Sequence, residues 1–220
     1  VVGGPVNNGG DVFRWARDNM FDAEKSTAAL LGTDAYDLMT KIASRVPAGS
    51  AGLIFHPYLG GERAPIWDAN ARGSFFGLNH GHTRAHMLRS VLEGITFNVY
   101  MVSLALEEVV GELHSIQATG GFARSPLWRQ MFADIFEQPV TVPEAFESGS
   151  LAAVIVAQKA LGKIDNLYDI SKYIGSSNTY QPLPENFEAY RELAPIFIRL
   201  SRQLQTEYEN IANYQRKHTK

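Results

Sequence analysis

Two adjacent glycines, Gly120 and Gly121, lie where this sequence most readily offers a ligand-binding turn. The residues before them, 113–118, predict a short strand, and apolar residues recur at helical spacing over 127–136. Glycine has no Cβ, so the backbone between strand and helix can take positive φ and a ligand can approach it closely. The free N–H groups of such a turn and the dipole of the following helix favour an anion such as a phosphate.

The residues after this turn mark the start of the helix. Ser125 is a suitable N-cap, and Pro126 occupies the first helical position, where proline is tolerated. A strand, a Gly-Gly turn and a helix also form an ordinary tight connection, so a purely structural interpretation stays open. The turn is not a P-loop, because no Gly-Lys-Ser/Thr follows, and it lacks the spacing of a dinucleotide fingerprint.

A second glycine pair, Gly9 and Gly10, precedes another predicted helix over 12–21, with Asp11 as its expected N-cap. This pair is a second candidate for a turn that faces a nucleotide. A simple helix cap explains the same pattern, so the sequence alone does not decide between the two interpretations.

The loop 60–68 also begins with two glycines and carries charges of both signs, Glu62 and Arg63. Because loops often carry function, both residues are candidates for a role in ligand binding. Local ion pairs that hold the loop together are the alternative explanation.

His80, His82 and His86 are close in sequence, and histidine is a common metal ligand. However, His82 precedes the expected helix cap at Thr83, and no cysteine or carboxylate accompanies the three, so we predict no metal site. No aspartate or glutamate can be named a catalytic base from spacing alone.

Composition excludes several classes of partner. A formal net charge of −3 gives no basic footprint for nucleic acid, and no apolar run approaches the ~20 residues of a membrane span. The chain has no cysteine, which excludes disulfides and thiol nucleophiles and fits a cytoplasmic protein. It opens on two valines without an initiating methionine, which indicates a piece of a longer protein.

Alternating short strands and helices predict an α/β domain. Strands are expected at 53–59, 73–78, 113–118 and 140–142, and helices at 12–21, 34–44, 83–110, 127–136, 151–161 and 185–211, the last interrupted near Pro195.

These segments resemble the C-terminal domain of the FGGY carbohydrate kinases. The resemblance covers residues 3–161 and rests on four blocks: a family signature over 73–93, a Gly-Glu-Arg-x-Pro loop over 59–73, an adenosine-site block over 120–140, and a following element over 147–153. The last block begins at Glu147 and departs from the family at Ala152, where a glycine is usual.

The resemblance implies the fold shared by actin, heat-shock chaperone ATPases and sugar kinases, a mixed sheet of ribonuclease-H-like topology flanked by helices. Residues 1–220 would form the C-terminal nucleotide-binding domain. The implied reaction is phosphoryl transfer from ATP, with Mg²⁺, to a sugar hydroxyl in a cleft between two domains, which requires positioning and charge stabilisation.

The resemblance also assigns roles to individual residues. Gly120 and Gly121 would lie against the α-phosphate and ribose of ATP or ADP, and Ser125 would lie beside the adenine. Gly10 and Arg14 match positions that line the nucleotide, where a guanidinium could pair with phosphate oxygens or stack on the base.

Other parts of the family's site are expected upstream of this chain: the catalytic base, an Asp-x-Gly-Thr phosphate loop, the Mg²⁺ ligands and most sugar contacts. The implied partners are therefore a small sugar or sugar acid and the protein's own N-terminal domain. A homodimer stays open.

Within the family, the block over 120–136 together with residues 6–10 most resembles gluconate kinases, with xylulose kinases next. This predicts phosphorylation of gluconate to 6-phosphogluconate. A pentulose kinase is the alternative within the class, and a non-catalytic nucleotide-binding or interaction module is the alternative from another class.

Overall fold

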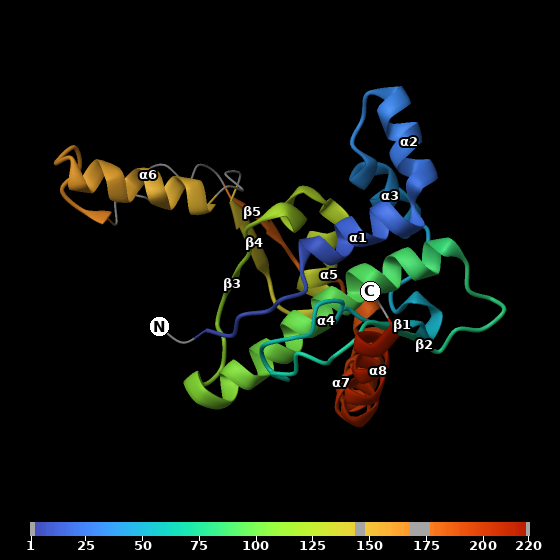
Figure 1. The fold of residues 1–220 in the computed structure, drawn as a ribbon. Coiled ribbons are helices and arrows are strands. Elements are labelled where there is room, and N and C mark those ends of the chain that lie inside the picture. The colour runs from blue at the N-terminus through green and yellow to red at the C-terminus, as the bar shows by residue number, and fades with distance from the viewer. Residues whose placement is uncertain (1–2, 144–147, 168–176, 219–220) are drawn as a thin grey trace.

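The computed structural model describes residues 3–143, 148–167 and 177–218, and its central element is the long helix α4 (Arg84–Val110), which crosses the molecule in Figure 1. The helix begins where the sequence predicts, because Thr83 and His86 form a reciprocal capping box. Its apolar side chains Leu88, Val91 and Leu92 are fully buried. Among the described helices, none is both long and apolar enough to cross a membrane.

Three α-helices precede the first strand and lie on one side of α4 (Figure 1): α1 (Gly10–Met20), α2 (Asp22–Leu31) and α3 (Ala35–Ala43). The expected cap at Asp11 is wrong: Gly9 is the N-cap, and Asp11 lies inside the first turn, where its carboxylate accepts a hydrogen bond from the Gly9 N–H at 2.8 Å. The sequence analysis missed α2, because only Ala28 of this helix is buried and no apolar stripe marks it.

The strands form two small sheets. β1 (Ile54–His56) pairs antiparallel with β2 (Ser74–Phe76). β3 (Ile116–Gln117) pairs parallel with β4 (Val140–Pro143), and β4 pairs antiparallel with β5 (Ser177–Tyr180). The mixed α/β class is thereby confirmed, although β1, β2 and β3 are shorter than predicted and β5 was not predicted.

Between β3 and β4 the chain makes the Gly-Gly turn, a short 3₁₀ helix η2 (Gly121–Arg124) and α5 (Pro126–Phe136). The predicted cap is confirmed, since the Ser125 hydroxyl accepts a hydrogen bond from the Trp128 N–H at 3.3 Å. The next helix, α6 (Ser148–Ala160), extends away from the other elements in Figure 1. Glu147, which precedes it, lies outside the described residues.

Two helices end the chain: α7 (Phe187–Gln203) and α8 (Gln205–His218). The expected interruption near Pro195 is wrong, because α7 continues through this residue and the chain breaks at Leu204 instead. Ala194 and Phe197 are buried on either side of Pro195, and their packing compensates for the hydrogen bond that proline cannot donate.

A buried charged pair ties α4 to α7. The carboxylate of Glu93, only 2% exposed, accepts hydrogen bonds from Arg89 Nε at 2.7 Å and from the Tyr190 hydroxyl at 3.1 Å. It also accepts from the Gly49 N–H at 2.9 Å and the Ser50 hydroxyl at 2.7 Å. The Glu93 carboxylate is thus fully hydrogen-bonded and paired with the Arg89 guanidinium. The network therefore holds Gly49 and Ser50, which precede β1, against α4 and α7 without leaving the buried charge unsatisfied.

His56 links β1 to α7 in the core. Its ring is fully buried, and Nε2 donates a hydrogen bond to the Phe197 carbonyl at 3.1 Å, so Nδ1 is the acceptor for the Ser74 hydroxyl at 3.1 Å. Burial lowers the pKa of His56 to about 4, because an imidazolium here would lose its hydration.

This burial predicts a loss of stability in mild acid. The unfolded chain binds a proton at His56 near its ordinary pKa of 6.5, whereas the folded chain does so only near 4. The free energy of unfolding should therefore fall by about 3 kcal/mol as the pH drops from 6.5 to 4, in addition to other titrations. Urea unfolding of the wild type and of His56→Gln across this range measures the difference. Parallel pH profiles for the two proteins would contradict the assignment.

Candidate functional site

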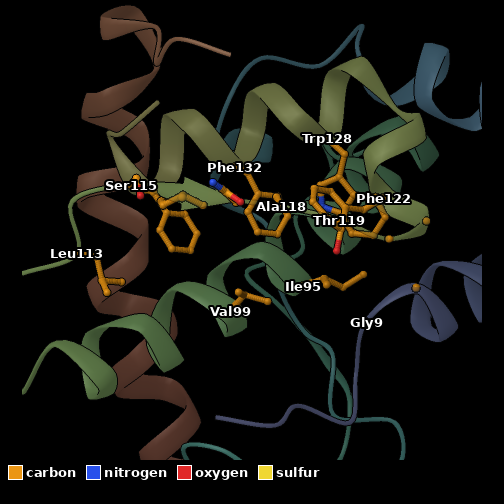
Figure 2. A pocket seen from close by; sticks show the side chains of 16 residues that line it. Gly9, Ile95, Val99, Leu113, Ser115, Ala118, Thr119, Phe122, Trp128 and Phe132 are labelled. Atoms are coloured by element: carbon orange, nitrogen blue, oxygen red, sulfur yellow. The ribbon is translucent and has the colours of Figure 1, made fainter. Parts of the chain in front are cut away.

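A cavity of about 620 Å³ lies beside the Gly-Gly turn, between α4 and α5 (Figure 2). Ile95 and Val99 of α4 form one wall, and the aromatic rings of Trp128 and Phe132 of α5 form the opposite one. Each side chain reaches the cavity because it lies on the buried side of its amphipathic helix. The volume falls within the range of ordinary small-molecule sites.

The aromatic wall is held in place by a buried hydrogen bond. The indole N–H of Trp128 donates to the Thr96 hydroxyl of α4 at 2.9 Å. Phe13 of α1 and Phe122 of η2 meet the indole edge-on, with ring centroids 5.5 and 5.8 Å away. The indole therefore joins α1, α4 and η2 around one side chain, which makes this wall rigid.

The two glycines of the turn differ in what they require. Gly120 has a φ of 108°, a conformation that favours glycine. Gly121 does not have positive φ, and a Cβ placed on it would meet no atom within 4 Å. The positive φ that the sequence allowed at this turn therefore occurs at Gly120 and not at Gly121, which faces open space. The first N–H groups of η2 have no carbonyl acceptor within their own helix, so they suit an anion in that space.

The second glycine pair meets the first across the cavity. Gly9 and Gly10, at the N-terminus of α1, line the same cavity as Gly120 and Gly121 (Figure 2 labels Gly9). The structure thus brings together two turns that are more than a hundred residues apart in the chain.

A second cavity, of about 430 Å³, shares Gly10, Gly121, Phe122 and Trp128 with the first and continues to Ser125. Its far side is formed by residues that the sequence analysis did not select: Phe13, Asp34, Tyr36, Asp37 and Arg124. Asp34 and Tyr36 belong to the start of α3, and no spacing in the sequence relates them to the glycine turns.

The remaining predicted site residues lie outside both cavities. Arg14 is exposed and lines neither of them, so its contact with nucleotide stays a prediction. Glu62 is buried and Arg63 is exposed, and they too are absent from both linings. Among the described residues no group of three His, Cys, Asp or Glu side chains could hold a metal ion.

The first cavity is built for binding rather than for proton transfer. The residues that line it, all of them described, are apolar, aromatic, glycine or uncharged polar residues, without an ionisable side chain. Aromatic rings and backbone N–H groups together suit a ligand with a planar apolar part and an anionic part. A general base for chemistry at this cavity is not supplied by its walls.

The sequence itself matches known proteins over most of its length. A model of the C-terminal domain of the FGGY family of carbohydrate kinases matches residues 1–161. The chain belongs to the FGGY family of carbohydrate kinases. The domain described above is therefore a sugar-kinase domain, with the α/β architecture that the resemblance implied.

Individual relatives are similar over nearly the whole chain. A gluconokinase from Bacillus licheniformis is 55% identical over 217 residues, which is 98% of this chain and 42% of the relative. A xylulose kinase from Staphylococcus epidermidis is 30% identical over 190 residues, 86% of this chain and 36% of the relative. The chain thus spans less than half the length of these relatives.

Solved structures agree with the sequence matches. A gluconate kinase from Lactobacillus acidophilus superposes with a TM-score of 0.79 at 42% identity, covering 94% of this chain and 40% of the other. A ligand-bound xylulose kinase from the same species gives a TM-score of 0.79 at 41% identity, with the same coverage.

The open space at Gly121 gives a sharp test of ligand binding. Gly121→Ala adds a methyl group that meets no protein atom, so the free energy of unfolding should stay unchanged or rise by up to ~1 kcal/mol. The same methyl group would keep a phosphate away from the backbone N–H at this turn. Loss of that hydrogen bond should raise the Kd for ADP at least about tenfold, since a hydrogen bond to a charged group contributes ~1.5–3 kcal/mol. Isothermal calorimetry measures the Kd.

Gly149→Ala is the matched control. Gly149 lies in α6, and a Cβ there also meets nothing within 4 Å, but the residue lines neither cavity. This variant should bind ADP as the wild type does. Equal ADP affinity in wild type and Gly121→Ala would exclude close contact at the turn.

Proposed function

We propose that this chain is the nucleotide-binding half of a kinase that transfers a phosphoryl group from ATP to gluconate, giving 6-phosphogluconate. The observation that carries the proposal is the pair of glycine turns facing one cavity, Gly9-Gly10 and Gly120-Gly121. The similarity to gluconokinases over 98% of the chain supports gluconate as the acceptor.

In this proposal the two cavities, which share four lining residues, hold different parts of the nucleotide. The N–H groups at Gly120 and Gly121 face the α-phosphate and ribose, because these glycines leave room for close approach. Ser125, in the second cavity, lies beside the adenine, with the Trp128 indole as an apolar surface. The N-terminus of α1 at Gly10 adds a favourable dipole for the phosphates.

The remaining catalytic parts are proposed to lie outside this chain. Residues 1–220 form one lobe, and an N-terminal domain supplies the general base, the sugar contacts and the Mg²⁺ ligands. The donor set of the described residues does not fit a resident Mg²⁺, because no group of three or more His, Cys, Asp or Glu side chains among them could hold a metal ion. We therefore assign no step to a metal held by this chain, and we place the protein in the cytoplasm, where ATP is available.

Two alternatives remain candidates. A xylulose kinase also matches 94% of the chain in structure at 41% identity, which favours a pentulose as the second choice of acceptor. A non-catalytic nucleotide-binding module would keep the cavities but have no phosphoryl transfer.

Turnover measurements separate these functions. We call the chain together with its proposed N-terminal domain the natural-length protein. The chain alone, mixed with ATP, Mg²⁺ and gluconate, should release ADP ~10²–10⁴-fold more slowly than the natural-length protein, because the general base is missing. Coupled ADP release from the natural-length protein should be fastest with gluconate among gluconate, xylulose, ribulose and glycerol.

Each contrary outcome has a clear meaning. Preference for xylulose or ribulose would select the pentulose kinase. ADP binding without turnover on any acceptor would select the non-catalytic module. Comparable rates for the chain and the natural-length protein would place a catalytic base within these residues.

A further inference from the structure

The carboxylate of Glu62 is buried among neutral donors. Its side chain is 2% exposed. Oε1 accepts from the backbone N–H groups of Asn7 at 2.6 Å and Arg63 at 2.8 Å, and Oε2 accepts from the side-chain amides of Asn8 at 3.0 Å and Asn98 at 2.7 Å. A buried carboxylate that accepts four such bonds is fully satisfied, so it fixes its four donors firmly in place.

These donors come from three separate parts of the chain. Asn7 and Asn8 belong to the segment 5–8, Arg63 to the loop 60–68, and Asn98 to α4. The loop is itself closed by reciprocal backbone hydrogen bonds between Glu62 and Asp68, both of 2.9 Å. Glu62 therefore lies at the junction of an irregular segment, a closed loop and the central helix.

Further contacts bind the segment 5–8 along its length. The Asn8 side chain donates to the Gly61 carbonyl at 2.6 Å. Arg63 donates from Nε to Asn7 Oδ1 at 2.6 Å and from a terminal nitrogen to the Val6 carbonyl at 3.1 Å. The exposed guanidinium thus covers the outside of the segment while the buried carboxylate holds it from the inside.

Two of the residues bonded to Glu62 are followed in the chain by residues that line the cavity. Asn8 is followed by Gly9 and Gly10, which line the cavity, and Asn98 is followed by Val99, which lines its α4 wall. Next to Gly9, the Asn8 side chain is held both by Glu62 Oε2 and by the Gly61 carbonyl of the same loop, and the Gly9 N–H donates to Asp11. Because Glu62 Oε2 accepts from both Asn8 and Asn98, it links the segment before the Gly9-Gly10 turn directly to α4.

We propose that Glu62 is a positioning residue that sets nucleotide affinity by holding the Gly9-Gly10 turn against α4, with Arg63 as its outer support. This inference rests on the proposed nucleotide site. It replaces direct ligand contact by Glu62 and Arg63 with an indirect role through the segment 5–8.

The chemistry of the network predicts how substitutions differ. Glu62→Ala removes the acceptor for all four donors. Glu62→Gln keeps one oxygen for the backbone N–H groups and turns the other into a donor. Asn98 can accept from that donor if its amide turns over, because its buried Oδ1 has no hydrogen-bond partner among the described residues. Glutamine should therefore restore much of what alanine removes.

Glu93→Gln is the matched control. Glu93 is also 2% exposed and accepts four hydrogen bonds, but from groups that do not adjoin the cavity. Loss of this network should lower the midpoint temperature of unfolding. It should not change the Kd for ADP at temperatures where the variant stays folded.

The experiment uses the natural-length protein, with the Kd for ADP from calorimetry and the KM values for ATP and gluconate. Glu62→Ala should raise the Kd for ADP and the KM for ATP at least about tenfold, with the KM for gluconate unchanged. Glu62→Gln should lie much closer to the wild type, and Glu93→Gln within about twofold of it. An unchanged Kd in folded Glu62→Ala, or an equal loss in Glu93→Gln, would overturn the inference.

Two further measurements keep the test independent of folding and of the proposed function. Arg63→Ala, at an exposed position, should weaken ADP binding several-fold. An unchanged Kd for ADP in this variant would contradict the role of Arg63 as the outer support of the segment 5–8. Hydrogen exchange at residues 9–13, measured without nucleotide, should accelerate in Glu62→Ala, and unchanged exchange would overturn the positioning role. Failure of the wild type to bind ADP would instead refute the proposed function.

Discussion

The close packing of strand β1 on helix α4 is the constraint on which the rest of the structure depends. At Gly94 the two backbones approach so closely that an added Cβ would overlap with the Phe55 carbonyl oxygen. This contact fixes the rotation of α4 about its axis. In consequence Ile95 and Val99 face the cavity, whereas Glu93 and Asn98 meet the polar networks that hold the surrounding loops.

Local rules were sufficient for the elements around the site. The cap at Ser125 and the start of α4 at Thr83 follow from the hydrogen-bonding needs of helix ends, which are visible in the sequence. Tertiary packing decided the elements that the sequence analysis placed wrongly or missed. Helix α2 buries almost nothing, and α7 continues through Pro195 because its neighbours in the helix are buried.

The candidate site could be predicted only in part for the same reason. The glycine turns were recognisable because two glycine pairs precede predicted helices in the sequence, and the family resemblance linked them to a nucleotide. That Tyr36 and Asp34 line the same cavity as Ser125 could not be predicted, since it depends on how α3 packs. Glu62 was selected as a loop charge, but its hydrogen bonds to Asn7, Asn8 and Asn98 exist only in the folded chain.

The proposed function depends on the nucleotide occupying the space between the two glycine turns. A crystal structure of the natural-length protein with ADP tests this most directly. We expect the α-phosphate and ribose to lie against Gly120 and Gly121 and the adenine to lie beside Ser125. ADP bound elsewhere, with both cavities occupied only by solvent, would contradict it.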